Sequence, residues 1–162
     1  MEKPRMLKRD YTPSKSAEYS TGGGSANCDT MTAACVSELM NAATSIHKLH
    51  LKVKGTGSYA AHKALNELYD ALPGHADDLA EGYQGAAEKL LDYKEVAPRV
   101  LNSVEDALAY IREMVSMVTG LQAKMPYSEI VNDLDTIKST LNSTKYKFCL
   151  LYTSPSPRDQ RG

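Results

Sequence analysis

The sequence contains no tryptophan, one phenylalanine and three cysteines in 162 residues. Three cysteines without a regular spacing argue against a disulfide framework. No apolar run approaches the ~20 residues of a membrane-spanning helix. The N-terminal segment MEKPRMLKRDYTPSKS lacks the apolar centre of a signal peptide. We therefore expect a cytoplasmic protein with no membrane partner.

The chain also lacks an excess of positive or negative charge, because its formal net charge is −1 at pH 7. A chain of near-zero net charge is not a polyanion binder by its bulk charge. Apolar residues make up 42% of the chain and charged residues 24%, which is the balance of an ordinary globular protein. At ~100–200 residues per domain, and with no internal repeat, we expect one folded domain.

The N-terminal residues, 1–27, contain serines, two prolines and a run of three glycines, which is typical of a flexible tail. This tail is weakly basic, whereas residues 28–148 are acidic. Its cations can contact DNA phosphates, an interaction that salt weakens steeply, although a solvated tail is the simpler interpretation. The candidate DNA-contacting residues are Lys3, Arg5, Lys8 and Arg9.

The C-terminal residues, 149–162, have a different character again. Their segment CLLYTSPSPRD resembles the translated read-through of a sequencing-library adapter. We therefore interpret 149–162 as a non-native tail and leave it out of the fold prediction. A genuine Ser/Pro-rich tail is the alternative. The predicted domain is 28–148.

Four segments of this domain have apolar residues at helical spacing. They cover about residues 29–53, 58–83, 103–125 and 128–148. The first two are joined by a short glycine-containing connection, so they should be antiparallel neighbours. Residues 85–102, with a short helical piece expected at 86–93, are too long for a simple turn. The sequence therefore predicts an all-α, ferritin-like four-helix bundle with a long crossover between helices two and three.

Local signals refine these helices. Asp29 or Thr30 is placed to cap the first one, and Ser103 with Asp106 forms a capping box for the third. Pro73 lies inside the second helix, where it removes one backbone hydrogen bond. We expect that helix to be bent but continuous, with a break into two helices as the alternative.

Two histidines are predicted to meet across the first connection. His50 lies about four residues before the end of helix one, and His62 about four residues after the start of helix two. At ~1.5 Å rise per residue both are ~6 Å from the hairpin end, and both fall on inward-facing stripes. Two facing imidazoles can share a metal ion or a water molecule. The alternative is a pair of core histidines without a ligand.

Carboxylates lie further along helix two. Asp77 and Glu81 form an i, i+4 pair that can converge on one cation, although such a pair is usually a solvated helix face. Asp77 is ~22 Å along the helix from His62, so one chain cannot bring them to one ion. A two-fold axis across helix two brings the acids of one subunit to the histidines of another. We therefore expect a homodimer with two shared sites.

The spacing His50-(11 residues)-His62-(14 residues)-Asp77-x-x-x-Glu81 resembles the signature of the miniferritins, the DNA-binding proteins from starved cells (Dps). It is most similar to the Dps-like proteins that bacteriophages encode. The resemblance implies iron bound between subunits by these four residues and Fe(II) oxidation by peroxide or oxygen, a ferroxidase activity. It also implies a closed, dodecameric cage that stores ferric mineral and protects DNA under oxidative stress.

The chain departs from that signature at Asn66, where the family usually has an aspartate, and at the Pro73-Gly74 pair within helix two. Asn66 is a weaker, neutral ligand. Iron is the expected metal, with Mn or Zn compatible with the same mixed ligands. A non-catalytic helical bundle, with a DNA-binding or phage-assembly role, is the alternative function.

Overall fold

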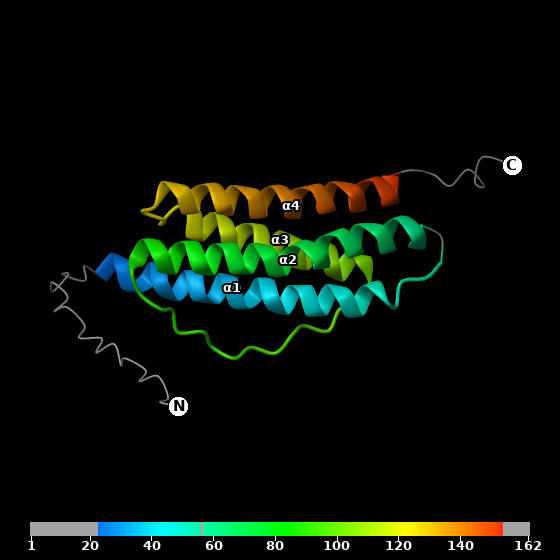
Figure 1. Ribbon diagram of the computed structural model, residues 1–162. Helices are drawn as coiled ribbons and strands as arrows, with labels where there is room; N and C mark the ends of the chain where they lie inside the picture. Colours follow the sequence, from blue (N-terminus) through cyan, green and yellow to red (C-terminus); the bar gives the residue numbers. More distant parts are fainter. Residues whose placement is uncertain (1–22, 56, 154–162) are drawn as a thin grey trace, which may run out of the picture.

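The computed structural model describes residues 23–55 and 57–153, which form four α-helices and no strand. The helices are α1 (Gly23–His50), α2 (Ser58–Ala87), α3 (Val104–Gln122) and α4 (Ser128–Thr153). They lie side by side as a four-helix bundle, so the predicted all-α fold class is confirmed (Figure 1). Within the described ranges, every helix is too short or too polar to cross a membrane.

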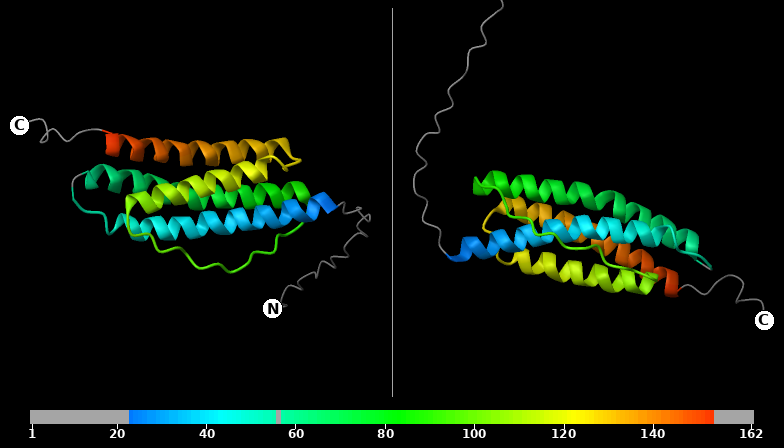
Figure 2. Two further views of the ribbon diagram at one scale, coloured as in Figure 1. Left: turned by 180° about the vertical axis from the view of Figure 1, so that it is seen from behind. Right: turned by 90° about the horizontal axis from the view of Figure 1, so that it is seen from below.

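The connections set the topology. α1 and α2 are antiparallel, and the segment after α2 then runs the length of the bundle beside α1 before α3 begins (Figures 1 and 2). As a result α3 runs parallel to α2, and α4 returns in the opposite direction. The long crossover between helices two and three is therefore present as predicted, and it places residues 88–103 against the outside of α1.

The short helical piece predicted at 86–93 does not form as a separate helix. α2 continues to Ala87, and Glu88 then adopts the left-handed conformation with φ of 52°. The side-chain oxygen of Gln84 accepts a hydrogen bond from the backbone N–H of Leu91 at 2.9 Å. The bond satisfies the N–H of Leu91 without a helical partner. The chain after α2 can therefore continue in an extended conformation.

The helix ends differ most from the predicted ones in two places. α1 begins at Gly23, inside the predicted N-terminal tail, and α4 continues to Thr153, inside the predicted non-native tail. Asp29 is therefore an internal residue of α1 and does not cap it. Its carboxylate instead accepts hydrogen bonds from Tyr83 Oη at 2.6 Å and from Lys89 Nζ at 2.5 Å.

Other local predictions hold. The capping box is present, since Asp106 N–H donates to Ser103 Oγ at 3.1 Å and Ser103 N–H donates to Asp106 Oδ2 at 3.2 Å. Pro73 lies within an uninterrupted α2. Gly55 and Gly57, with φ of 93° and 77°, adopt the left-handed conformation in the connection between α1 and α2. Such angles are easy for glycine and costly for other residues, which explains the tight turn.

The core is formed by apolar side chains from all four helices. The apolar stripe of α4, whose helical spacing underlies the prediction of a helix at 128–148, is entirely buried: Ile130, Leu134, Ile137, Leu141 and Phe148. Two tyrosines, Tyr83 and Tyr110, are also buried. They supply large aromatic side chains to the core of a chain that has no tryptophan. Burial of these side chains removes apolar surface from water and supplies the main favourable contribution to folding.

Candidate functional site

His50 and His62 lie against each other where α1 and α2 meet the hairpin connection. Their imidazole rings are stacked, with centroids 3.6 Å apart and an interplanar angle of 28°. Nδ1 of His50 is 3.0 Å from the carbonyl oxygen of His62, and Nδ1 of His62 is 3.2 Å from the carbonyl oxygen of His50. The prediction that the two residues meet across the hairpin is confirmed, but α1 ends at His50 itself and not about four residues later.

These reciprocal bonds fix the tautomer of both rings. A carbonyl oxygen can only accept a hydrogen bond, so each Nδ1 must carry the proton. In the neutral imidazole the remaining nitrogen, Nε2, then has a free lone pair. Histidines that bind metal ions are commonly held in this way, with one nitrogen bonded to a backbone carbonyl and the other available to the ion. Each ring therefore keeps one nitrogen, Nε2, outside these hydrogen bonds.

The two rings differ in their exposure to solvent. His50 is buried, with 6% of its surface exposed, whereas His62 is exposed. The prediction of an inward-facing position is therefore right for His50 and wrong for His62. The physical reason is that His62 lies at the edge of α2 beside α1, where its ring covers the ring of His50 and leaves its own outer side in solvent. The pair is consequently accessible from one side.

Two further rings adjoin the pair. The ring of Tyr69 is stacked on that of His47, with centroids 4.0 Å apart, and lies edge-on to His50 at 5.1 Å. Tyr69 was not among the residues predicted for the histidine site. The signal was present, because Tyr69 is seven residues after His62 and so lies two turns away on the same side of α2.

Asn66, which was predicted as a weak metal ligand, is engaged in hydrogen bonds. Its side-chain oxygen accepts from Tyr69 Oη at 2.8 Å, and its side-chain nitrogen donates to Asp70 Oδ2 at 2.7 Å. These bonds hold Tyr69 beside the histidines. Asn66 therefore positions the ring of Tyr69, and its role as a weak metal ligand stays a prediction.

The carboxylates are not brought to the histidines within one chain. Asp77 and Glu81 are exposed on α2, and neither makes a hydrogen bond or ion pair with the rest of the described structure. Across 23–55 and 57–153, no group of three or more His, Cys, Asp and Glu side chains is close enough to hold a metal ion. One chain alone supplies two imidazoles, and any further ligands must come from elsewhere.

The remaining candidate residues do not join this site. His75 is half-buried on the other side of α2, where its Nε2 is 2.9 Å from Thr140 Oγ1 of α4. The four cations predicted to contact DNA lie in 1–22, outside the described residues: Lys3, Arg5, Lys8 and Arg9.

The comparisons with known proteins identify one family. Residues 50–148 match a family described as "Family of unknown function (DUF5856)". No curated protein and no solved structure matches the chain. The comparisons find this family and no Dps or ferritin-like family, so the prediction of miniferritin membership is wrong. The histidine and carboxylate spacing alone was too short a pattern to define a family.

Proposed function

We propose that this chain, which belongs to the DUF5856 family of unknown function, binds a divalent transition-metal ion at a site shared by two copies. In each site one copy contributes His50 and His62, and the other contributes Asp77 and Glu81. The observation that carries the proposal is the reciprocal Nδ1–carbonyl bonding of the two histidines. Because each Nδ1 is held by a backbone carbonyl, the Nε2 lone pair of each ring is left for a metal ion.

The ligand set supports this reading. Two imidazole nitrogens with carboxylate oxygens form a mixed set that suits Fe(II), Mn(II) or Zn(II). A single copy would offer two nitrogens only, fewer than the four ligands of a typical tetrahedral site. Exposed carboxylates on α2 with no other described partner complete the set from a second copy.

The surface around the pair supports an association of two copies. Leu51 and Tyr59 flank the histidines and are 73% and 76% exposed. Large apolar side chains in such positions favour burial against a partner. An isologous dimer, the commonest oligomer geometry, would cover both flanks and generate two equivalent sites.

The reaction that we propose for this site is oxidation of Fe(II), with iron as the substrate. Two Fe(II) ions each lose one electron to one molecule of hydrogen peroxide, which takes up two protons and leaves as two water molecules. The chain's own residues bind and orient the ion through His50 and His62. We place this activity in the cytoplasm, and three cysteines that form no disulfide within the described residues are compatible with this location.

The test is a titration of the full chain with Co(II), read by absorbance, followed by Fe(II) oxidation with peroxide. The His62→Ala variant and the Asp77→Asn, Glu81→Gln double variant should each weaken Co(II) binding by at least about 100-fold, because each removes groups that contact the ion directly and not only groups that orient them. Both should lower the rate of Fe(II) oxidation. All the substituted side chains are exposed, so the fold should be retained.

A matched control is Asp78→Asn, because Asp78 is exposed, adjacent to Asp77 and rotated ~100° away around α2. This control should bind Co(II) like the wild type. Equal loss in Asp78→Asn and in Asp77→Asn, Glu81→Gln would mean that the general negative charge of the helix attracts the ion. Unchanged Co(II) binding by His62→Ala would refute the site itself.

A further inference from the structure

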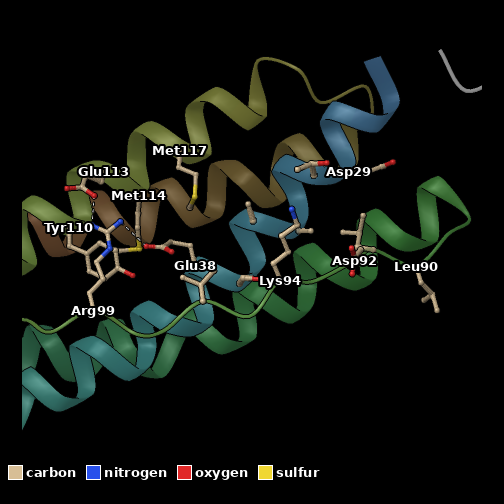
Figure 3. Close-up of a pocket in the computed structure, with 16 residues that line it drawn as sticks. Asp29, Glu38, Leu90, Asp92, Lys94, Arg99, Tyr110, Glu113, Met114 and Met117 are labelled. Atoms are coloured by element: carbon tan, nitrogen blue, oxygen red, sulfur yellow. Dashed lines mark hydrogen bonds and ion pairs between the residues drawn. The ribbon is translucent and has the colours of Figure 1, made fainter. Parts of the chain in front are cut away.

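Ion pairs join the crossover to the bundle near its start and near its end. Near its start, Lys89 Nζ forms an ion pair with Asp29 at 2.5 Å. Near its end, the guanidinium of Arg99 lies 3.1 Å from Glu38 of α1 and 2.5 Å from Glu113 of α3. Between these two points the chain is extended and bows away from α1 (Figures 1 and 3). The crossover therefore spans an open space like a strap.

A cavity of about 730 Å³ lies beneath this strap, between α1 and α3. Its size falls in the ~300–1,000 Å³ range of sites for small molecules. Ala33, Met114 and Met117 contribute apolar walls, and Leu91 and Val96 contribute from the strap. Apolar side chains thus line much of the cavity. Charged side chains lie at the Arg99 end, with Glu38 and Glu113, and also further along the cavity, at Lys94, Asp92 and Asp29 (Figure 3).

That end contains two buried polar atoms that lack a hydrogen-bond partner among the described residues. They are Tyr110 Oη and Glu38 Oε1, the latter ion-paired with Arg99 but without a hydrogen bond to it. Tyr110 is 2% exposed. Burial first, and then the neighbouring Glu38 carboxylate, raises the pKa of Tyr110, so its hydroxyl stays protonated at neutral pH. A buried polar group left without a hydrogen bond is costly and uncommon in folded proteins.

We infer that the cavity binds an amphipathic amine, whose apolar body packs on the methionines and whose ammonium group donates to Glu38 and Tyr110. At this end the carboxylates of Glu38 and Glu113 outnumber the one guanidinium of Arg99, so a cation is favoured. An ammonium carries three donors and can satisfy both oxygens together. A ligand carboxylate would instead face two like charges.

Isothermal titration of the full chain with octylamine, 1-octanol and octanoate at pH 7 tests the head-group preference. These probes share one apolar body and differ in charge. Octylamine should bind at least about tenfold more tightly than 1-octanol, and octanoate should bind the most weakly, since a hydrogen bond to a charged group contributes about 1.5–3 kcal/mol. Equal affinity for the three probes would overturn the proposal, because it would leave only apolar packing.

Two variants test the residues. Tyr110→Phe keeps the ring and Glu38→Gln keeps the side-chain shape, and each should weaken octylamine binding by about tenfold. Glu95→Gln is the control, because it makes the same charge change on the strap outside the cavity lining and should bind octylamine normally. Far-UV circular dichroism checks that each variant folds.

A third variant, Met117→Trp, fills the cavity from α3 and should abolish binding of octylamine while leaving Glu38 and Tyr110 in place. Octylamine binding that is indifferent to all three substitutions would show that the amine binds elsewhere and would contradict the inference. The histidine site is at the opposite end of α1 from this cavity, so loss of one activity does not account for loss of the other.

Discussion

Two of the three connections of this bundle handle their polar groups in opposite ways. At the hairpin between α1 and α2, His50 and His62 exchange hydrogen bonds with each other's backbone. At the crossover, the ion pairs of Arg99 leave Tyr110 Oη and Glu38 Oε1 without hydrogen bonds in the described structure. The short connection is internally satisfied, whereas the long one is not.

The hairpin and the crossover are therefore stabilised by different interactions. Hydrogen bonds between the chain's own groups hold the hairpin, and Nε2 of each imidazole takes no part in them. Ion pairs hold the crossover near its two ends. The polar atoms left without a hydrogen bond there are buried, and a buried polar atom without a hydrogen bond lowers the stability of the fold. Removing a group should therefore be costly at the hairpin and nearly neutral at the unsatisfied end of the crossover.

The largest expected effect is that of His50→Ala. This change leaves a cavity and an unpaired carbonyl at a buried position, so it should lower the free energy of unfolding by about 2–3 kcal/mol. His62→Ala removes an exposed ring and should cost about 1 kcal/mol. Urea denaturation followed by circular dichroism measures both. Equal effects would mean that the pair does not have a buried and an exposed member.

Next in size is Gly55→Ala in the hairpin connection. Gly55 has a φ of 93°, a conformation that costs a residue with a Cβ about 1–2 kcal/mol. Gly74→Ala is the matched control, because Gly74 lies inside α2 with nothing within 4 Å of the added Cβ. That change should stabilise the protein by about 0.5–1 kcal/mol. Thermal unfolding should thus move in opposite directions for the two variants.

A smaller effect on stability is expected for Asp29→Asn, which removes the charge on the α1 partner of Lys89. Burial acts to raise the pKa of Asp29, but hydrogen bonds from Lys89 and Tyr83 outweigh it and the net shift is downward. A lowered folded-state pKa stabilises the fold above the unfolded value of about 3.9, and that contribution is lost as the pH falls through the folded value. The carboxylate is partly exposed, so we expect a loss of about 1 kcal/mol at pH 7.

The deficit of Asp29→Asn should shrink steadily when urea denaturation is repeated from about pH 5 down to about pH 2. Glu95→Asp, a change in the crossover with no ion pair among the described residues, should show no such pH dependence. A deficit that stays constant with pH would mean that Asp29 acts through packing and not through its charge.

The smallest effect on stability is expected for Tyr110→Phe. It removes a buried hydroxyl that has no hydrogen bond in the described structure, so it should leave the free energy of unfolding unchanged or raise it by up to about 1 kcal/mol. A loss above about 1 kcal/mol in urea denaturation would show that the hydroxyl is satisfied in solution. The comparison between the two connections would then fail at the crossover.

Much of this structure followed from the sequence, because helical spacing of apolar residues reports directly on burial. The α4 stripe and the Ser103–Asp106 capping box were read correctly, as was the meeting of His50 with His62. The helix ends were less predictable. Nothing local marks Gly23 as a start, and Asp29 looked like a cap because its partners, Tyr83 and Lys89, are distant in sequence.

The same reason explains what was missed at the sites. Ring contacts such as His47 with Tyr69 depend on how α1 and α2 pack, which spacing along one helix does not specify. The cavity under the crossover depends on where an extended segment lies, and extended segments carry no periodic signal. The miniferritin assignment failed because four residues of suitable chemistry, set on a common fold, do not define a family.

The most direct test of the central claim is a complementation between two inactive variants. One carries His50→Ala and His62→Ala, and the other carries Asp77→Asn and Glu81→Gln. If the site is shared, each variant alone binds no Co(II), and mixed dimers formed by refolding them together contain one intact site. An equimolar mixture should then recover roughly a quarter of the wild-type sites. Recovery of none, with mixed dimers verified by native mass spectrometry, would contradict a site built by two copies.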